Sequence, residues 1–427
     1  MKDQLKYFIK EKTIINWIFI LCFLIYLKKL PISSETQPFY IFGISLFFIL
    51  VNKIKLSSLD IFLGLHIVIL SIYFTIQFTL YRTGLVEFFA YLVGPLVYFT
   101  FKNRIHLVNL KYAKTFTIMF VALTIIIQLK IPILYEVVKQ FYELFIPRAD
   151  WMDGSNIRGV TLLAPEPSYF SYSAILLITI FDVLDYRIKK KINLYKWAIV
   201  LIALFSKSAL VFIYVFFYFL FYYLGDNPFA FLKKISTKKI LIYVGFFVVA
   251  IIPLFFIRTR VSIVFGNFLN YLTTDGGLTK LFLTEVSGST RFILNGFAFM
   301  SLEYAPFGWG IGQFPFNYQA VANNFPEIVN NHWEFMMAYK ENRPLKAQTY
   351  FANLIADIGV FSIMGFIFVF STIFKATGNK IKRSLQWVSV LMLIIIQAQI
   401  SNPIPWILLA IINTDFSVFE KEKIINE

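Results

Sequence analysis

Long apolar runs separated by short polar loops dominate this chain. A transmembrane helix needs about 20 mostly apolar residues, within a range of roughly 17–25, and runs of this kind recur along the whole sequence. The stretch 195–224 is too long for one straight crossing and divides at Ser206-Lys207-Ser208, where a charge interrupts it. The pattern predicts twelve spans, the second of them short and the last weak, at 14–30, 38–52, 59–80, 84–101, 112–129, 166–184, 195–206, 208–224, 239–257, 349–374, 384–401 and 403–415.

Two connections, 130–165 and 258–348, are much longer than the others. Loops beyond about 15 residues are usually functional or disordered, and the many aromatic residues in both connections argue against disorder. The segment 132–146 has the pattern of an amphipathic helix lying on a membrane. We therefore expect an all-α polytopic protein, with 1–427 as a single integral membrane domain and the two long loops as a cap.

Composition agrees with this fold class. Hydrophobic residues make up 58% of the chain, 51 residues are Phe, and only 15% are charged, which excludes an ordinary soluble domain. The net charge of +16 could suggest nucleic acid as a partner. We do not expect one, because the lysines lie in short loops, as the positive-inside rule predicts. Cys22 is the only cysteine, and the three histidines are scattered, so neither a disulfide nor a metal cluster is expected.

The lysines indicate the orientation of the predicted helices. Alternate loops are lysine-rich, and this set includes both termini, which places both ends in the cytoplasm. The lysines and apolar run at the N-terminus could imitate a signal peptide, but Lys28-Lys29-Leu30-Pro31 follows in place of a small-x-small cleavage site, which favours an uncleaved first span. The basic residues of the inner loops are found at Lys53/Lys55, Lys102/Arg104/Lys111, 187–191, 233–239 and Lys380/Lys382/Arg383.

The arginines follow the opposite distribution. Most of them fall in the outer loops, where orientation gives no reason to collect cations. The planar guanidinium suits bidentate binding of phosphate or carboxylate, so we expect an enzyme or carrier that handles an anionic substrate on the outer side. The outer arginines are Arg82, Arg148, Arg158, Arg258, Arg260, Arg291 and Arg343.

The segment from Arg158 to Tyr169 is the first candidate for chemistry. Proline is favoured in the first turn of a helix, so Glu166-Pro167-Ser168 predicts the outer N-terminus of the sixth span. Free amides and a partial positive charge gather at such a terminus. Glu166 could cap these amides and pair with Arg158, or it could orient an arginine or act as a base. Both interpretations stay open.

Two further segments lie in the second long loop. Ser287 to Arg291 is followed by Pro306-Phe307-Gly308-Trp309-Gly310-Ile311-Gly312, where alternate glycines permit positive φ and close backbone approach. This loop lacks the ending of a nucleotide-binding loop, and a tight turn and a ligand contact are both open. Arg258 and Arg260 follow the ninth span directly and could hold a lipid diphosphate, or they could simply snorkel at the interface.

The tenth span begins with Tyr350 and continues through Asn353 and Asp357 to Gly359. Asn353 and Asp357 are one helical turn apart and share a face. A carboxylate inside a span is costly and usually functional. Glu87 and Asp182 also lie in or near spans, but no other polar motif accompanies them, and we interpret both as structural.

The order of these motifs resembles that of the O-antigen polymerase and ligase superfamily. The sequence shows Arg-Gly-(x)6-Glu-Pro-Ser before a span, an arginine in a large outer loop, Pro-Phe-Gly-x-Gly-x-Gly, and then Tyr-x-x-Asn-x-x-x-Asp-x-Gly at a helix start. The likeness covers about 158 to 360, together with the twelve-span topology. It implies a metal-independent C-type glycosyltransferase of the bacterial inner membrane, without a cofactor, that uses an undecaprenyl-diphosphate-linked oligosaccharide as donor.

The resemblance also implies roles for individual residues. Arg158 and Arg291 would contact the donor diphosphate, with Arg258 or Arg260 assisting, since positioned charge alone can stabilise such a leaving group. Glu166 is the first choice for the base that removes a proton from the acceptor hydroxyl. The other substrate-binding residues expected are Ser168, Tyr169, Gly310, His332, Tyr350 and Asn353.

One departure from the pattern bears on the kind of transfer. Ligases of the superfamily carry a histidine next to an asparagine just before the tenth span, whereas this chain has Gln348-Thr349 there and His332 earlier. The difference favours a polymerase of O-antigen or capsule type, with membrane lipid around it and a chain-length regulator protein as a possible partner. A ligase that transfers glycan to lipid A-core is the alternative within the superfamily.

Two other classes fit the sequence less well. A lipid-linked oligosaccharide flippase should carry charges inside its spans and have short loops on both faces. A scaffold for polysaccharide assembly would leave the arginine distribution unexplained.

Overall fold

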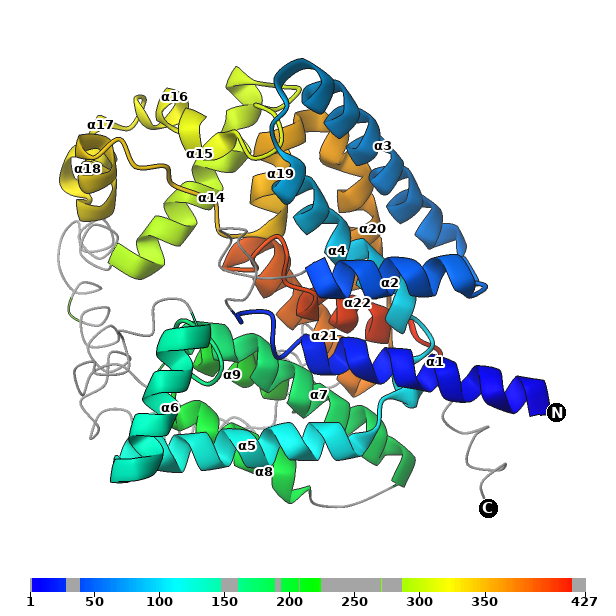
Figure 1. Ribbon diagram of the computed structural model, residues 1–427. Coiled ribbons are helices and arrows are strands. Elements are labelled where there is room, and N and C mark those ends of the chain that lie inside the picture. The colour runs from blue at the N-terminus through cyan, green and yellow to red at the C-terminus, as the bar shows by residue number, and fades with distance from the viewer. Residues whose placement is uncertain are drawn as a thin grey trace, which may run out of the picture.

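The structure is a computed structural model that describes residues 2–27, 39–146, 160–188, 193–206, 208–223, 270 and 286–416. Every element in these ranges is a helix (Figure 1), which confirms the predicted helical class. Four of the described helices are long and apolar enough to cross a membrane: Ser58–Tyr81, Leu110–Leu129, Pro167–Leu184 and Tyr350–Ile373. Shorter apolar helices accompany them, and the full count of twelve spans stays a prediction.

The N-terminal part forms five helices close to the predicted positions. Capping defines two of the helix starts: Ser57 and Asp60 form a capping box before α3, and the Asn109 side chain accepts a hydrogen bond from the Lys111 amide at the start of α5. The first helix begins at Lys2 and not near residue 14. The elements are α1 (Lys2–Leu21), α2 (Phe39–Val51), α3 (Ser58–Tyr81), α4 (Leu85–Phe101) and α5 (Leu110–Leu129).

One face of α3 is apolar and exposed. Ile61, Leu65, Val68, Ile72 and Ile76 recur every three or four residues and are 43–58% exposed. A stripe of large apolar side chains this long is unusual on a soluble protein. Such a stripe is what a helix at the edge of a bundle presents to lipid, and it supports the assignment of the chain to a membrane.

The middle of the chain confirms a predicted break. After the short turn η3 (Pro167–Tyr169) and α7 (Phe170–Ile188), the chain forms α8 (Leu194–Phe205) and α9 (Ala209–Tyr223). The stretch predicted to divide at 206–208 is thus two helices. The ninth predicted span, 239–257, lies outside the described residues.

The C-terminal part departs from the predicted straight helices. The run 349–374 consists of α19 (Tyr350–Ile358), a turn η4 (Gly359–Ser362) and α20 (Ile363–Ile373). Gly359 has φ +58°, and a Cβ there would lie 2.1 Å from the Pro306 carbonyl oxygen. The glycine therefore lets the loop that contains Pro306 pass against the helix break.

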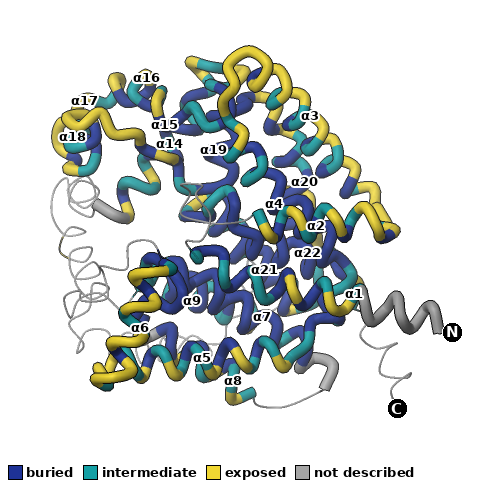
Figure 2. Tube along the Cα trace, viewed as in Figure 1, coloured by how far each residue is buried: buried dark blue, intermediate teal, exposed yellow. Residues whose placement is uncertain are grey.

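The predicted helix 384–401 is wrong at both ends. Helix α21 (Lys380–Val390) starts earlier, continues as a π-helical turn η5 (Leu391–Ile395) and then stops, and residues 396–403 are not helical. Helix α22 (Ile404–Asn413) follows. Its ten residues extend about 15 Å, about half the thickness of a hydrocarbon core. Helix α22 is buried along nearly its whole length (Figure 2), so it lies inside the protein.

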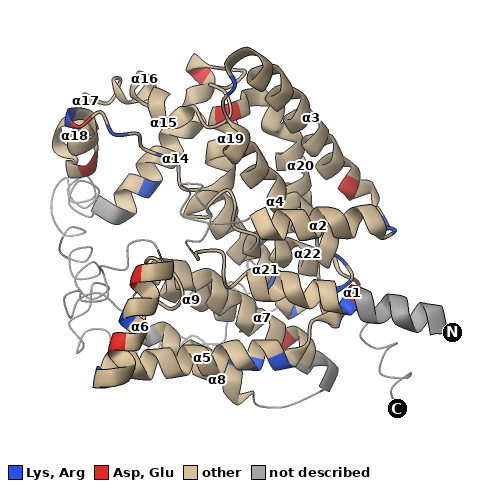
Figure 3. Ribbon diagram, viewed as in Figure 1, with Lys and Arg blue, Asp and Glu red and all other residues tan. Residues whose placement is uncertain are grey.

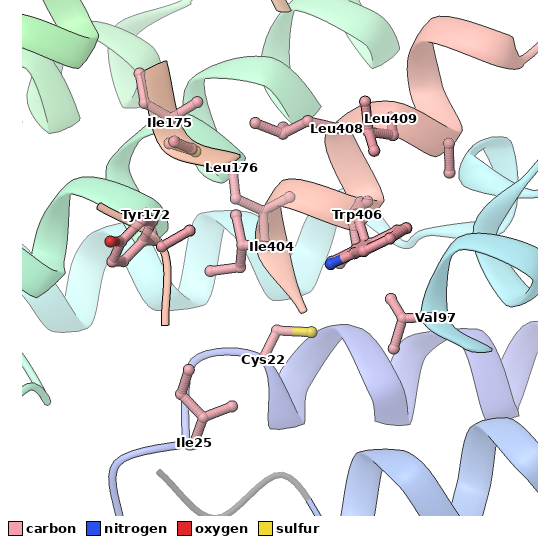
Figure 4. Close-up of a cluster of buried hydrophobic side chains, with 14 of the residues drawn as sticks. Cys22, Ile25, Val97, Tyr172, Ile175, Leu176, Ile404, Trp406, Leu408 and Leu409 are labelled. Carbon is pink, nitrogen blue, oxygen red and sulfur yellow. The ribbon is translucent and has the colours of Figure 1, made fainter. Parts of the chain in front are cut away.

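The helices pack as two groups around α21 and α22. Helices α2, α3, α4 and α20 form one group, and α5, α7, α8 and α9 form the other (Figure 1). Helix α21 packs against α9 and α22, and α22 packs against α4 and α7. Trp406 of α22 lies close to Val97 of α4 (Figure 4). A Cβ on Gly94 would lie 2.1 Å from Nε1 of Trp406, so the glycine permits this close packing.

Five helices build a separate layer over α19. They share a second apolar cluster that includes Leu294, Phe297, Phe314 and Phe335, so the described part of the second long loop is folded around a core of its own. These helices are α14 (Val286–Tyr304), α15 (Phe314–Asn317), α16 (Gln319–Ala322), α17 (Pro326–Asn331) and α18 (Trp333–Lys340). In the first long loop, α6 (Pro132–Phe145) forms where an amphipathic helix was predicted.

The described loops predicted to be inner, at Lys53/Lys55, Lys102/Arg104/Lys111 and Lys380/Lys382/Arg383, meet at one end of the bundle. Arg104 lies 2.5 Å from Glu11 of α1 and donates a hydrogen bond to the Lys53 carbonyl at 3.2 Å. Lys382 donates to the Thr414 carbonyl at 2.6 Å, just after α22. The contact with Glu11 brings α1 to this end, and α14–α18 lie at the other (Figures 1 and 3). We call the end that carries α14–α18 the cap end.

Candidate functional site

The segment that leads into α7 is held by α6. The hydroxyl of Tyr142 donates a hydrogen bond to the Thr161 carbonyl and accepts one from the Leu163 amide at 2.9 Å. Residues 160–165 are buried, and Leu163 adopts a left-handed conformation with φ +51°. The first long loop thus fixes the backbone immediately before Glu166.

Glu166 occupies the predicted helix start. It is the N-cap residue of η3, with extended backbone angles, and Pro167 takes the first position of the turn. The Ser168 hydroxyl lies 3.3 Å from Oε2 of Glu166. Tyr169 is buried and stacks on Tyr26 with ring centroids 5.4 Å apart. Glu166 is half-buried, whereas Tyr169 contributes to packing.

Arg291 lies on α14, on the face that contacts the end of η5 and the start of α19. Asn295 is one helical turn further on and shares this face. Its Nδ2 atom donates to the Ile395 carbonyl at 3.2 Å, and its Oδ1 atom accepts from the amides of Gln348 and Thr349 at 2.8 and 3.2 Å. One face of α14 is therefore pinned to the end of η5 and to the start of α19.

Two buried tyrosines connect Arg291 to the non-helical segment 396–403. The hydroxyls of Tyr172 and Tyr214 donate to the Gln397 carbonyl at 2.8 and 2.9 Å. Both tyrosines interact electrostatically with Arg291. Because Tyr172 lies in the first turn of α7, the fold brings Arg291 to the helix that the Glu166 segment begins.

His332 stabilises the layer of helices α14–α18. It is fully buried, its Nε2 atom lies 2.8 Å from the Ser289 hydroxyl, and its ring packs against Phe335. Burial lowers the pKa of His332, and this effect exceeds the opposing attraction of Glu334. Ser289 precedes Arg291 by two residues, so His332 holds the start of α14 against α18.

The glycine-rich loop 306–312 is a packed turn. Gly308, Gly310 and Gly312 have φ values of +84°, +105° and +75°. The Gly310 amide donates to the Asp357 carbonyl at 2.9 Å, and the Gly312 amide donates to the Asp357 carboxylate at 3.0 Å. A Cβ on Gly308 would lie 2.2 Å from the Asp357 carbonyl oxygen. The glycines therefore serve close packing on α19, and the amide of Gly310 is occupied.

Tyr350 and Asn353 also have protein partners. The buried Tyr350 hydroxyl lies 3.3 Å from Nε2 of His66 and donates to the Tyr91 carbonyl. The side-chain amide of Asn353 donates to the carbonyls of Ala347 and Thr349 at 2.9 and 2.7 Å. These contacts give both residues a structural role at the start of α19.

The remaining predicted residues are either paired or outside the described ranges. Asp182 pairs with Lys196 at 2.6 Å and accepts from Tyr218 at 2.8 Å, which agrees with its structural interpretation. Arg158, Arg258 and Arg260 lie outside the described residues. Within the described ranges, no group of three or more His, Cys, Asp or Glu side chains is placed to hold a metal ion.

Gln397, Tyr172 and Tyr214 were not predicted from the sequence. A signal was present, because Gln397, Gln399 and Ser401 are polar residues inside the apolar run predicted to be the eleventh span, and Asn402 follows it directly. Nothing in the sequence distinguishes Tyr172 and Tyr214 from the other tyrosines of the chain, which has 24 in all.

Comparisons with family models, with curated proteins and with solved structures find no match to this chain.

Proposed function

We propose that this protein is a polymerase that joins undecaprenyl-diphosphate-linked oligosaccharide repeat units, of O-antigen or capsule type, on the outer face of the bacterial inner membrane. The observation that carries the proposal is the position of Arg291. Asn295, on the same helix face, donates to the Ile395 carbonyl at the end of η5 and accepts from the amides of Gln348 and Thr349, and α14 belongs to the end of the bundle opposite the lysine-rich loops. An arginine held there suits the diphosphate of a lipid-linked donor.

The chemistry follows from these positions. The acceptor hydroxyl oxygen forms a bond to the anomeric carbon of the donor, and the bond from that carbon to the diphosphate breaks, with the electron pair leaving on the diphosphate. Arg291 stabilises the charge that develops on the leaving group. The acceptor proton passes to the Glu166 carboxylate, which acts as general base. Arg158 and Arg258 or Arg260 contribute further positive charge.

Two ion pairs of the described bundle favour an enzyme over a flippase. Asp182 is paired with Lys196, and Asp60 is paired with Lys102, so both carboxylates are neutralised by neighbours. A flippase needs charges that remain available along a central pathway. Within the superfamily, the alternative of a ligase is disfavoured because His332 is engaged with Ser289.

Loss of the gene in cells that carry this chain tests the proposal. A missing polymerase should leave single repeat units on the lipid carrier, exposed on the outer face, and should remove all longer polymer. Repeats confined to the inner face would indicate a flippase, and long polymers retained on the lipid carrier would indicate a ligase. Wild-type protein should restore polymer, whereas the Arg291→Ala variant should not.

A further inference from the structure

The segment 396–403 is a buried polar interruption between two helices. Gln397 and Asn402 are each 1% exposed, and Ser401 is 6% exposed. Non-helical backbone at membrane depth is tolerated where it is enclosed by protein or lines a polar cavity. Asn295, on the same face of α14 as Arg291, donates to the carbonyl of Ile395, the residue directly before this interruption.

The backbone of the segment is held in one conformation from several sides. The Ile396 amide donates to the Leu391 carbonyl at 2.8 Å, and the Ala398 amide donates to the Gln348 carbonyl at 2.9 Å. The Gln397 carbonyl accepts from both tyrosine hydroxyls, on α7 and α9. Such fixation is what a binding element requires, because its polar groups then need no rearrangement to receive a ligand.

Among the described residues, Gln397 and Asn402 of the segment each have one buried side-chain atom without a hydrogen-bond partner. In the described part of the chain, Oε1 of Gln397 and Nδ2 of Asn402 make no hydrogen bond, although both side chains are buried. Oδ1 of Asn402 accepts from the Ile404 amide at 3.0 Å, which fixes the orientation of this amide. The segment therefore offers one acceptor and one donor. Buried polar groups in native proteins are normally paired, so this pair of atoms suits a ligand with hydroxyl groups, each of which can both donate and accept.

We propose that the segment 396–403 is a sugar subsite that binds the first sugar of the donor, the one attached to the diphosphate. Asn295, one helical turn after Arg291, donates to the Ile395 carbonyl, two residues before Gln397, so a sugar next to Gln397 and Asn402 could continue to a diphosphate at Arg291. This inference rests on the proposed function. It adds that the donor is recognised by its first sugar as well as by its diphosphate.

Substitution of Gln397 tests the subsite. Gln397→Leu removes the acceptor at similar size, and Gln397→Glu retains an acceptor oxygen. Gln386→Leu is the matched control, because Gln386 is also a buried glutamine. It lies on α21, before the segment 396–403, and its side-chain amide donates to the Lys375 carbonyl. Binding of two probes to purified protein is measured: undecaprenyl-diphosphate-linked repeat unit and undecaprenyl diphosphate without sugar.

We expect Gln397→Leu to weaken binding of the sugar-bearing probe about tenfold, as loss of one buried hydrogen bond implies, and to leave binding of the bare diphosphate lipid unchanged. Gln397→Glu keeps an acceptor oxygen but adds a negative charge close to the diphosphate, so it should weaken binding of both probes, and Gln386→Leu should bind both probes like wild type. Equal affinity of Gln397→Leu and wild type for both probes would overturn the subsite, as would an equal loss for both.

Wild-type protein decides the question if Gln397→Leu does not fold. The subsite requires the wild type to bind the sugar-bearing probe more tightly than the bare diphosphate lipid, and equal binding of the two probes would overturn it. Failure of the wild type to bind either probe would refute the proposed function itself.

Discussion

Arg291 illustrates how a single residue gains a role from the fold. Its face of α14 is fixed by Asn295 one turn further on, and the Ser289–His332 contact fixes the start of the helix on the opposite side. Among the described residues, no carboxylate forms an ion pair with its guanidinium, and Arg291 instead interacts with Tyr172 and Tyr214. Its charge is therefore suited to an anion that comes from outside the protein.

Replacement of Arg291 should separate charge from geometry. We expect Arg291→Ala to abolish polymer formation at normal protein levels. Arg291→Lys should restore little activity, because an ammonium cannot reproduce the bidentate geometry of guanidinium. The polymer ladder in cells is the measurement. Full activity of the lysine variant would show that general electrostatic attraction is sufficient.

Glu166 gives a second prediction at this scale. Glu166→Gln keeps the size of the side chain and removes the base, so the variant should bind the lipid-linked donor with wild-type affinity and lose turnover by about 100-fold or more. Donor binding and single-turnover rates measured on the same preparation test this. A near wild-type rate would place the base elsewhere, with His332 and Asp357 as the next candidates.

Arg291 and Glu166 became candidates from the sequence alone. The distribution of arginines between the loops indicated Arg291, and the proline that follows Glu166 indicated a helix start there. The sequence missed Gln397, since nothing in its neighbours reveals that two tyrosines from distant helices hold its carbonyl. Gly310 and Tyr350 were predicted to bind substrate. In the structure the Gly310 amide donates to Asp357 of α19, and the Tyr350 hydroxyl donates to Tyr91 of α4. The sequence alone does not distinguish such internal hydrogen bonds from contacts with a ligand.

At the scale of elements, hydropathy and charge located the helices and the break at 206–208, but not the interruptions at 359–362 and 396–403. The apolar run 349–374 contains Gly359, whose role depends on the Pro306 carbonyl of a separate loop. The run 384–401 is apolar on average, and the average conceals the polar residues at which η5 ends. Helix existence follows from local composition, whereas helix breaks depend on contacts distant in sequence.

The glycine-rich turn supplies a prediction about stability. Gly308→Ala combines a left-handed φ with a Cβ 2.2 Å from backbone, so it should destabilise the protein by more than about 1 kcal/mol. Gly296→Ala is the control, because Gly296 lies inside α14 and a Cβ added there would have no neighbouring atom within 4 Å, so alanine favours the helix. Thermal unfolding in detergent should show opposite shifts in Tm. Equal shifts would contradict a packing role for the turn.

At the scale of the whole molecule, the lysine-rich loops gather at one end and helices α14–α18 lie at the other. Because the lysine-rich loops are predicted to be cytoplasmic, we predict that the cap end faces the outside of the membrane. The ninth predicted span lies outside the described residues, as do Arg158, Arg258 and Arg260, three of the four arginines predicted to bind the donor diphosphate. Their positions stay predictions from sequence.

Cysteine labelling in intact cells tests the orientation. Asn323 is exposed at the cap end and Gly378 is exposed before α21 at the opposite end, while the native Cys22 is only 1% exposed and should give little background. A membrane-impermeant thiol reagent should label Asn323→Cys and should label Gly378→Cys only after the cells are opened. The reverse pattern would invert the molecule in the membrane.

The most direct measurement is polymerisation by the purified protein. Given undecaprenyl-diphosphate-linked repeat units in proteoliposomes with excess chelator, the wild-type protein should produce a ladder of lengthened lipid-linked glycans, and Arg291→Ala should not. The chelator belongs in the assay because arginine, rather than a metal ion, is proposed to stabilise the leaving diphosphate. Absence of any lengthened product from folded protein, or activity that appears only when a divalent ion is restored, would contradict this mechanism.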